Sequence, residues 1–236
     1  MAGPPSVLVV EDDAEIADAV LYALRKEGMA AGWARTLGAA MQGLGTTDAV
    51  VLDLGLPDGS GFSLLHAAAK LPDGPRMVVL TSRDEDVDCI AALEAGADDY
   101  VTKPFSPRAL IARLRAMLRR GPRVDTGASA AKSASGKLSV GALTIDVDRR
   151  DASVGLRAMA LTKIELDILA VLARAPGRVH TRDQLVERVW GGAYALAPRT
   201  VDSHVKALRR KLDAAGAPSG LLETVRSVGF RLQDVS

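Results

Sequence analysis

The sequence predicts an α/β module built on five parallel strands in a doubly wound sheet, followed by a smaller module of three helices and short antiparallel strands. Three observations support this prediction. Short apolar segments alternate with helical patterns up to about residue 120, which is typical of βαβ crossovers. A stretch rich in Ala, Ser and Gly comes next. Residues 1–120 contain 12 Lys and Arg against 17 Asp and Glu, whereas residues 121–236 contain 18 against 12, so the second module is basic.

The first half alternates five apolar segments with five helical patterns. Each expected strand is short and ends at a polar residue or a turn former, and each expected helix has apolar residues three or four positions apart. The expected strands are 6–10, 30–33, 50–53, 77–80 and 100–102, and the expected helices are 14–27, 36–45, 60–70, 86–95 and 110–118.

Five polar residues lie at the carboxyl ends of these strands: Glu11, Asp12, Asp53, Thr81 and Lys103. Because the carboxyl ends of parallel strands meet at one edge of a sheet, we expect the five side chains to converge on one crevice. Three adjacent carboxylates repel one another unless a cation lies among them, and hard oxygen ligands suit Mg²⁺. A carboxylate beside Mg²⁺ can attack phosphorus, and a hydroxyl and an ammonium can stabilise the phosphoryl oxygens.

Each of these residues also has an ordinary structural explanation. Glu11, Asp12 and Thr81 are acceptable helix caps, Asp53 could cap its own loop, and Lys103 could be a solvated lysine before a turn. Taken singly, the cap is the better explanation for Thr81, and the others are evenly balanced. The coincidence of five such residues at strand ends of one small sheet favours a phosphoryl-transfer site.

The second half begins after residues 121–136, which we expect to be a flexible linker between domains at 1–120 and 137–236. Short alternating segments in 138–161 predict a small antiparallel sheet. Thr162 with Glu165 three residues later forms a capping box at the start of a helix. Further helices are expected at 181–189 and 199–212, and a hairpin with Gly229 in its turn at 222–232.

The first half resembles a bacterial response-regulator receiver domain, which has a flavodoxin-like fold. The resemblance is carried by Val9 to Asp13, by the Asp53 strand and loop, by Leu80-Thr81-Ser82 and by Asp98 to Phe105. It implies that Asp53 is the phosphoacceptor and that Glu11, Asp12, Asp53 and the Gly55 carbonyl hold Mg²⁺. It further implies that Thr81 is the switch hydroxyl, Tyr100 the switch aromatic and Lys103 the phosphate-pairing lysine, with a cis peptide before Pro104.

The second half resembles the winged-helix DNA-binding domain of OmpR/PhoB-type regulators. The motifs are Leu161 to Glu165, Val189-Trp190-Gly191, Arg199 to Val205 and Thr224 to Phe230. The resemblance implies that the third helix enters the major groove and that Arg226 reaches the minor groove. The expected DNA contacts are Arg199, Thr200, Ser203, His204, Lys206, Arg209, Arg210, Thr224 and Arg226, although His204 could equally be structural. The loop 191–198 resembles the segment that contacts RNA polymerase.

The same resemblance implies a dimer face on the fourth helix, fifth strand and fifth helix of the first domain. We expect an apolar patch ringed by charges, with Asp99 and Arg113 paired across a twofold axis. The residues of this face are Ile90, Leu93, Asp98, Asp99, Ile111, Arg113 and Arg120. Cys89 and Ala109 depart from the family, because they occupy positions where a cation and an acid commonly pair across the dimer.

The leading hypothesis is a transcription factor that a sensor histidine kinase phosphorylates at Asp53, and that then dimerises and binds tandem DNA half-sites. No enzymatic activity is expected beyond phosphorylation and dephosphorylation of Asp53 itself. The rival hypotheses are a phosphoryl-transfer enzyme, for which Asp58 is the only nearby acid or base, and a constitutive DNA-binding protein. A single cysteine and the absence of a signal peptide or membrane span predict a cytoplasmic protein without a membrane partner.

Overall fold

The computed structural model describes residues 3–71, 74–82, 86–118, 136–191 and 198–234, without the side chains of 86–88 and 198–199. The chain divides into two compact units, Met1–Arg119 and Arg120–Ser236. The expected linker at 121–136 lies almost wholly outside the described residues, and the expected boundaries 1–120 and 137–236 remain predictions. Among the described helices, none is long and apolar enough to cross a membrane.

A parallel five-stranded sheet forms the centre of the N-terminal unit, in the order β2-β1-β3-β6-β7. The strands are β1 (Ser6–Val10), β2 (Ala30–Ala34), β3 (Ala49–Asp53), β6 (Arg76–Thr81) and β7 (Asp99–Thr102). The order reverses between β1 and β3, as in a doubly wound sheet. The predicted flavodoxin-like fold is therefore confirmed, and β3 and β6 are aliphatic because helices cover both of their faces.

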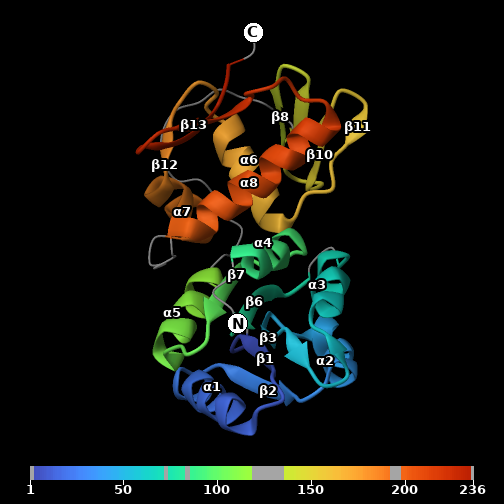
Figure 1. Ribbon diagram of the computed structural model, residues 1–236, viewed down its shortest axis with the longest axis vertical. Helices are drawn as coiled ribbons and strands as arrows, with labels where there is room; N and C mark the ends of the chain where they lie inside the picture. The colour runs from blue at the N-terminus through green and yellow to red at the C-terminus, as the bar shows by residue number, and fades with distance from the viewer. Residues whose placement is uncertain (1–2, 72–73, 83–85, 119–135, 192–197, 235–236) are drawn as a thin grey trace. The chain divides into compact units, whose positions relative to one another are not determined.

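Helices pack on both faces of this sheet, with α1 and α5 on one side and α2 and α3 on the other (Figure 1). The helices are α1 (Ala14–Lys26), α2 (Leu37–Gly43), α3 (Phe62–Ala69), α4 (Asp86–Glu94) and α5 (Pro107–Leu118), with a 3₁₀ turn η1 at Leu44–Thr46. Asp13 caps α1 by accepting from the backbone N–H groups of Glu15 and Ile16, and Thr36 caps α2 at Ala39. A small hairpin, β4 (Gly55–Leu56) and β5 (Gly59–Ser60), follows β3.

The described residues of the C-terminal unit form three helices and two small antiparallel sheets (Figure 1). The first sheet has the order β11-β10-β9-β8, and the second has the order β12-β14-β13. The strands are β8 (Lys137–Val140), β9 (Leu143–Asp146), β10 (Asp151–Val154), β11 (Arg157–Ala158), β12 (His180–Thr181), β13 (Leu222–Val225) and β14 (Gly229–Leu232). The helices are α6 (Lys163–Ala173), α7 (Arg182–Trp190) and α8 (Pro198–Ala215).

Capping boxes begin two helices of the C-terminal unit, and only one of them was predicted. The capping box of Thr162 and Glu165 is confirmed at the start of α6. A second capping box, Thr181 with Gln184, begins α7 and was not predicted. It carries the same spacing of a hydroxyl residue and a Glu or Gln three positions later, so the signal was available in the sequence.

The hairpin of β13 and β14 corrects the expectation that Gly229 serves its turn. Ser227 is the residue with positive φ, at 61°, whereas Gly229 is the first residue of β14. A Cβ atom on Gly229 would overlap the carbonyl group of His180 in the neighbouring strand β12. The glycine is therefore required for close approach between strands, and the turn is made by a residue in the left-handed region.

Candidate functional site

Three carboxylates meet at the carboxyl edge of the parallel sheet. Glu11 and Asp12 follow β1, and Asp53 ends β3, which pairs directly with β1. Each of the three residues offers an oxygen atom that lies within 4.8 Å of those of the other two. The adjacent parallel strands thus place the acidic residues as the sequence analysis expected, in a cluster that is suited to a divalent cation.

Lys103 supplies the counter-charge for this cluster. Its Nζ atom lies 2.8 Å from Glu11 Oε2 and 2.6 Å from Asp53 Oδ2. Lys103 directly follows β7, and the peptide bond between it and Pro104 is cis, as expected. One ammonium group therefore bridges two of the three carboxylates from the other side of the crevice.

Burial and charge act against each other at this edge. Burial raises the pKa of Glu11, and the nearby Asp53 carboxylate adds to the rise, although the Lys103 ammonium opposes it. At Lys103 burial disfavours the charge, but hydrogen bonds to Asp53 and Glu11 outweigh it and raise the pKa of the ammonium. Lys103 therefore stays protonated, while the acidic cluster, in which Glu11 is buried, favours a further cation.

The loop after Asp53 is folded back closely on that residue. Gly55 N–H donates to Asp53 Oδ1 over 3.0 Å, and Gly61 N–H donates to the Leu54 carbonyl over 3.1 Å. A Cβ atom on Gly61 would lie 2.8 Å from the Asp53 carbonyl oxygen and 2.9 Å from Leu54 Cα. Gly61 is thus required where the hairpin of β4 and β5 closes against the end of β3.

The two residues expected to act as a switch lie on neighbouring strands. Thr81 is the last residue of β6 and is buried, and β6 runs between β3 and β7. Tyr100 lies on β7, pairs in register with Val79 and packs against the aliphatic core while remaining half-buried. Their roles as a switch remain predictions.

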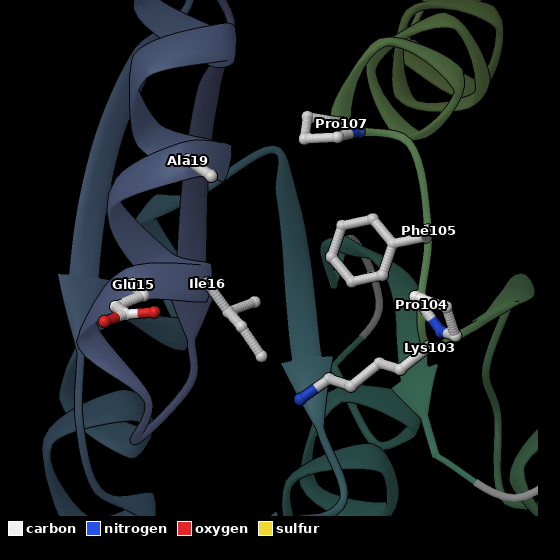
Figure 2. Close-up of a pocket in the computed structure, with 7 residues that line it drawn as sticks. All are labelled: Glu15, Ile16, Ala19, Lys103, Pro104, Phe105 and Pro107. Carbon is white, nitrogen blue, oxygen red and sulfur yellow. The ribbon is translucent and has the colours of Figure 1, made fainter.

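A pocket of about 510 Å³ adjoins the crevice at Lys103. Figure 2 shows Lys103, Pro104, Phe105 and Pro107 along one chain segment that faces Ile16 and Ala19 of α1. The alkyl stem of Lys103 lines this largely apolar pocket, while the ammonium reaches the carboxylates. The apolar wall therefore helps to direct the charged end of the lysine into the crevice.

In the C-terminal unit, basic residues lie on an exposed side of α8 and on the neighbouring hairpin. Lys206 and Arg210 of α8 are exposed, and so is Arg226 between β13 and β14. The opposite side of α8 is apolar and buried at Val201, Val205, Leu208 and Leu212, as predicted. A packed helix with an exposed basic side and an adjacent basic hairpin has the geometry of a helix that enters a DNA groove.

Comparison with known families identifies both units. Residues 7–115 match the family described as "Response regulator receiver domain". Residues 157–232 match the family described as "Transcriptional regulatory protein, C terminal". The chain belongs to the OmpR/PhoB family of response regulators. It is therefore a two-component response regulator with a receiver domain and a winged-helix domain of the kind that regulates transcription, and membership implies DNA and a cognate kinase as partners.

Similar proteins match over nearly the whole chain. "Sensory transduction protein RegX3" of Mycobacterium tuberculosis H37Rv is 42% identical over 233 residues, which cover 97% of this chain and 99% of that protein. "Transcriptional regulatory protein CreB" of Escherichia coli K12 is 38% identical over 230 residues, covering 97% of both. Among solved structures, a point mutant of RitR is similar with a TM-score of 0.71 and 25% identity, over 98% of this chain and 100% of that one.

Most of the described residues of the expected dimer face are buried within the receiver. Leu93 and Ile111 are buried in the core of their own domain, so they do not form an exposed patch, and Ile90 is half-buried. Asp98 and Asp99 are buried too. They pair within the chain, with Arg76 at 3.2 Å and with Arg113 at 2.7 Å. Within one receiver the Arg113 guanidinium therefore neutralises the Asp99 carboxylate, and the expected pair across a dimer stays a prediction. Arg120 lies outside the described residues.

Two residues of the winged-helix domain that were expected to contact DNA are buried, which for His204 favours the structural alternative. Thr200 and His204 are completely buried, and the His204 ring lies 5.7 Å from the Trp190 ring of α7. His204 faces α7, and both side chains are covered because α8 packs on more than one side. The side chain of Arg199 and most of the loop 191–198 lie outside the described residues. Ser203 is half-buried, and Thr224 is exposed.

Several contacts that the sequence analysis missed fix α8 within its domain. Arg209 donates to the Leu222 carbonyl and to Thr224 Oγ1, which ties α8 to β13. Lys211 Nζ lies 2.6 Å from the buried carboxylate of Glu165 at the start of α6. In each contact the two residues are far apart in the sequence, so no local pattern indicated these contacts. Arg209 and Thr224, both expected on DNA, are hydrogen-bonded to each other.

Proposed function

We propose that this response regulator is a transcription factor switched by Mg²⁺-dependent phosphorylation of Asp53. The observation that supports the proposal is the convergence of Glu11, Asp12 and Asp53 with the ammonium of Lys103 at one edge of the sheet. Three carboxylates against one ammonium leave a negative balance, which suits a divalent cation with oxygen ligands. The carboxylates of Glu11, Asp12 and Asp53 and the carbonyl of Gly55 would hold Mg²⁺, which when bound neutralises the charge of an incoming phosphoryl group.

Phosphorylation would proceed by direct displacement at phosphorus. A carboxylate oxygen of Asp53 forms the new O–P bond while the N–P bond to the phosphorylated histidine of a sensor kinase breaks, and the imidazole nitrogen keeps the electron pair. Lys103, already at hydrogen-bond distance from Asp53, would neutralise one phosphoryl oxygen, and the Thr81 hydroxyl would donate to another. The aspartyl phosphate adds negative charge and acceptor oxygens to the crevice. When Thr81 turns toward the phosphate, the Tyr100 side chain on β7 would turn into the space it leaves, and the α4–β7–α5 face would repack.

The output would be a homodimer on DNA. Repacking of the α4–β7–α5 face would favour pairing of two receivers, with half-buried Ile90 and Arg113 as the partly accessible described members of that face. Two winged-helix domains would then bind tandem half-sites, with α8 in the major groove and Arg226 in the minor groove. The loop at 191–198 would contact RNA polymerase.

The rival hypothesis of a phosphoryl-transfer enzyme had Asp58 as its candidate acid or base. Both carboxylate oxygens of Asp58 accept backbone N–H groups, from Leu37 over 2.7 Å and from Gly38 over 3.0 Å. These two amides, that of Gly38 first, lower the pKa of Asp58. Asp58 is therefore held as an ionised structural acceptor, a state that does not favour a role as general acid.

The test is sedimentation of the full chain with Mg²⁺, with and without beryllofluoride, which mimics the phosphoryl group. We expect the mimic to convert wild type from monomer to dimer, and Asp53→Ala to remain monomeric. Asp18→Ala, which removes an exposed carboxylate on α1, is the matched control and should behave as wild type. If wild type does not respond to the mimic, the phospho-switch is overturned in favour of a constitutive DNA-binding protein.

A further inference from the structure

One short segment touches both loops that carry the acidic residues. The segment, Trp33–Gly38, runs from the end of β2 through the Thr36 cap into α2. The first loop, residues 11–13, follows β1 and contains Glu11 and Asp12. The second loop, residues 54–61, follows Asp53 and includes the hairpin of β4 and β5. No pattern in the sequence indicated that one segment serves both.

The contact with the first loop is made by side chains of β2 and the residue after it. The indole N–H of Trp33 donates to the backbone carbonyl of Glu11 over 2.8 Å. Arg35 donates to the backbone carbonyl of Asp12 over 3.4 Å, and its guanidinium lies 5.4 Å from the centre of the Trp33 ring. Cation–π contact between the two side chains keeps both donors on the same loop.

The contact with the second loop is made by backbone amides of the same segment. The N–H groups of Leu37 and Gly38 donate to the two oxygens of Asp58, at the tip of the hairpin. The next amide, that of Ala39, donates to Thr36, so the first three amides of α2 all have acceptors. At its other end the hairpin returns to Asp53 through the Gly55 N–H. A chain of hydrogen bonds thus runs from α2 through the hairpin to the carboxylate expected to accept the phosphoryl group.

We infer that the segment Trp33–Gly38 acts as a clamp that positions both Mg²⁺-binding loops relative to each other, with Trp33 and Asp58 as positioning residues. The inference rests on the proposed function, because it concerns the same site. A Mg²⁺ ion demands near-ideal octahedral geometry, so small displacements of the carboxylates weaken it. Groups that orient metal ligands typically contribute a 10- to 100-fold effect on metal affinity. The clamp contacts the backbone carbonyls of Glu11 and Asp12 and the side chain of Asp58, and in none of these contacts does it occupy a carboxylate of the acidic cluster.

The test is the Mg²⁺ dissociation constant of the full chain, measured by calorimetry without any phosphoryl donor. We expect Trp33→Phe and Asp58→Ala each to raise it roughly tenfold, and the double variant to raise it further. Asp58→Asn keeps one acceptor oxygen and should recover part of the loss. If Asp58→Ala does not fold, the Mg²⁺ affinity of Asp58→Asn tests the inference in its place. Matched controls are Tyr22→Phe and Asp18→Ala, which remove similar groups from the exposed side of α1.

Two readouts separate positioning from loss of stability. Leu24→Ala creates a cavity in the core away from the loops, so it should lower the melting temperature without changing Mg²⁺ affinity. The fluorescence emission of Trp33 should change when Mg²⁺ is added. In Asp58→Ala the Mg²⁺ concentration at the midpoint of this change should rise by the same factor as the dissociation constant measured by calorimetry. Mg²⁺ affinities of Trp33→Phe and Asp58→Asn within twofold of wild type would overturn the clamp alone. A wild type that binds no Mg²⁺ would overturn the proposed function and the clamp together.

Discussion

The guanidinium of Arg182 holds the carboxylate of Asp202 through both oxygens, with Nε 3.1 Å from each and Nη2 2.7 Å from Oδ1. The pair joins α7 to α8, and the same guanidinium lies 4.9 Å from the centre of the Phe230 ring on β14. One side chain thus connects three elements of the winged-helix domain.

Arg182→Ala should destabilise the winged-helix domain by about 1–2 kcal/mol, because it removes a bidentate pair and a cation–π contact. Arg182→Lys should recover only part of this, since an ammonium lacks the planar fork. The measurement is urea unfolding followed by the emission of Trp190, which is fully buried in this domain, in a Trp33→Phe background. An unchanged midpoint in Arg182→Ala would show that the pair contributes nothing.

The winged-helix domain should lose stability in mild acid because of His180. Burial lowers the pKa of this imidazole below its usual value, and the charges of Arg188 and Arg178 lower it further. Its two ring nitrogens accept no hydrogen bond from the described residues. The unfolded chain therefore binds a proton first, so stability is complete above about pH 6.5 and falls below it, by at most about 1.4 kcal/mol per pH unit.

The check is urea unfolding at pH 7.5 and pH 5.5 for wild type and His180→Leu. The leucine variant should lose less stability between these pH values than wild type, because it removes the group that the unfolded state protonates. Equal losses in the two proteins would assign the acid sensitivity to other groups.

Gly61→Ala should weaken beryllofluoride binding to Asp53 by at least tenfold. The new methyl group would overlap the Asp53 carbonyl and Leu54 Cα, so the loop must move away from the end of β3. Misplacement of a reacting group by about 1 Å costs on the order of 100-fold in a positioned reaction. Gly45→Ala is the control, because a Cβ atom there meets nothing within 4 Å. A normal response of Gly61→Ala in the mimic titration would contradict this account.

DNA affinity should fall steeply with salt, and removal of exposed basic side chains should flatten that dependence. Lys206→Ala, Arg210→Ala and Arg226→Ala should each reduce the slope of log affinity against log salt by about 0.9 if the side chain contacts one phosphate. Titrations of a mixed-sequence duplex at several salt concentrations measure the slope. Arg149→Ala removes an exposed arginine between β9 and β10 and should leave it unchanged. Identical slopes in all variants would remove α8 and the hairpin from the DNA surface.

Much of the receiver could be predicted because short sequence patterns determine where its strands and helices begin and end. An apolar run that ends in Asp53 and a turn indicates a buried strand, and the parallel sheet then places Glu11, Asp53 and Lys103 at one edge. The salt bridges of Lys103 show that they do meet there. The same reasoning gave the positions of the helices in both domains to within a few residues, with the third helix of the second domain longer than expected.

What the sequence did not predict depends on packing between distant segments. A helical pattern identifies one apolar stripe, so it could not show that α7 also covers His204 with Trp190. The contact between Asp99 on β7 and Arg113 on α5 within one receiver joins residues 14 positions apart, and no pattern in the sequence indicated it. Trp33 and Glu11 are 22 residues apart, and a hydrogen bond from an indole to a backbone carbonyl leaves no trace in the sequence.

The contacts of α8 hold in place the helix that we propose to enter the major groove. Arg182 holds Asp202 in the first half of the helix, Lys211 binds Glu165 near its end, and Arg209 ties it to β13. A helix held at three points does not have to be ordered by its target. Binding to DNA should therefore proceed without folding of the helix, so the protein should lose little conformational entropy. The heat-capacity change on binding should match the value expected from the surface area buried between protein and DNA.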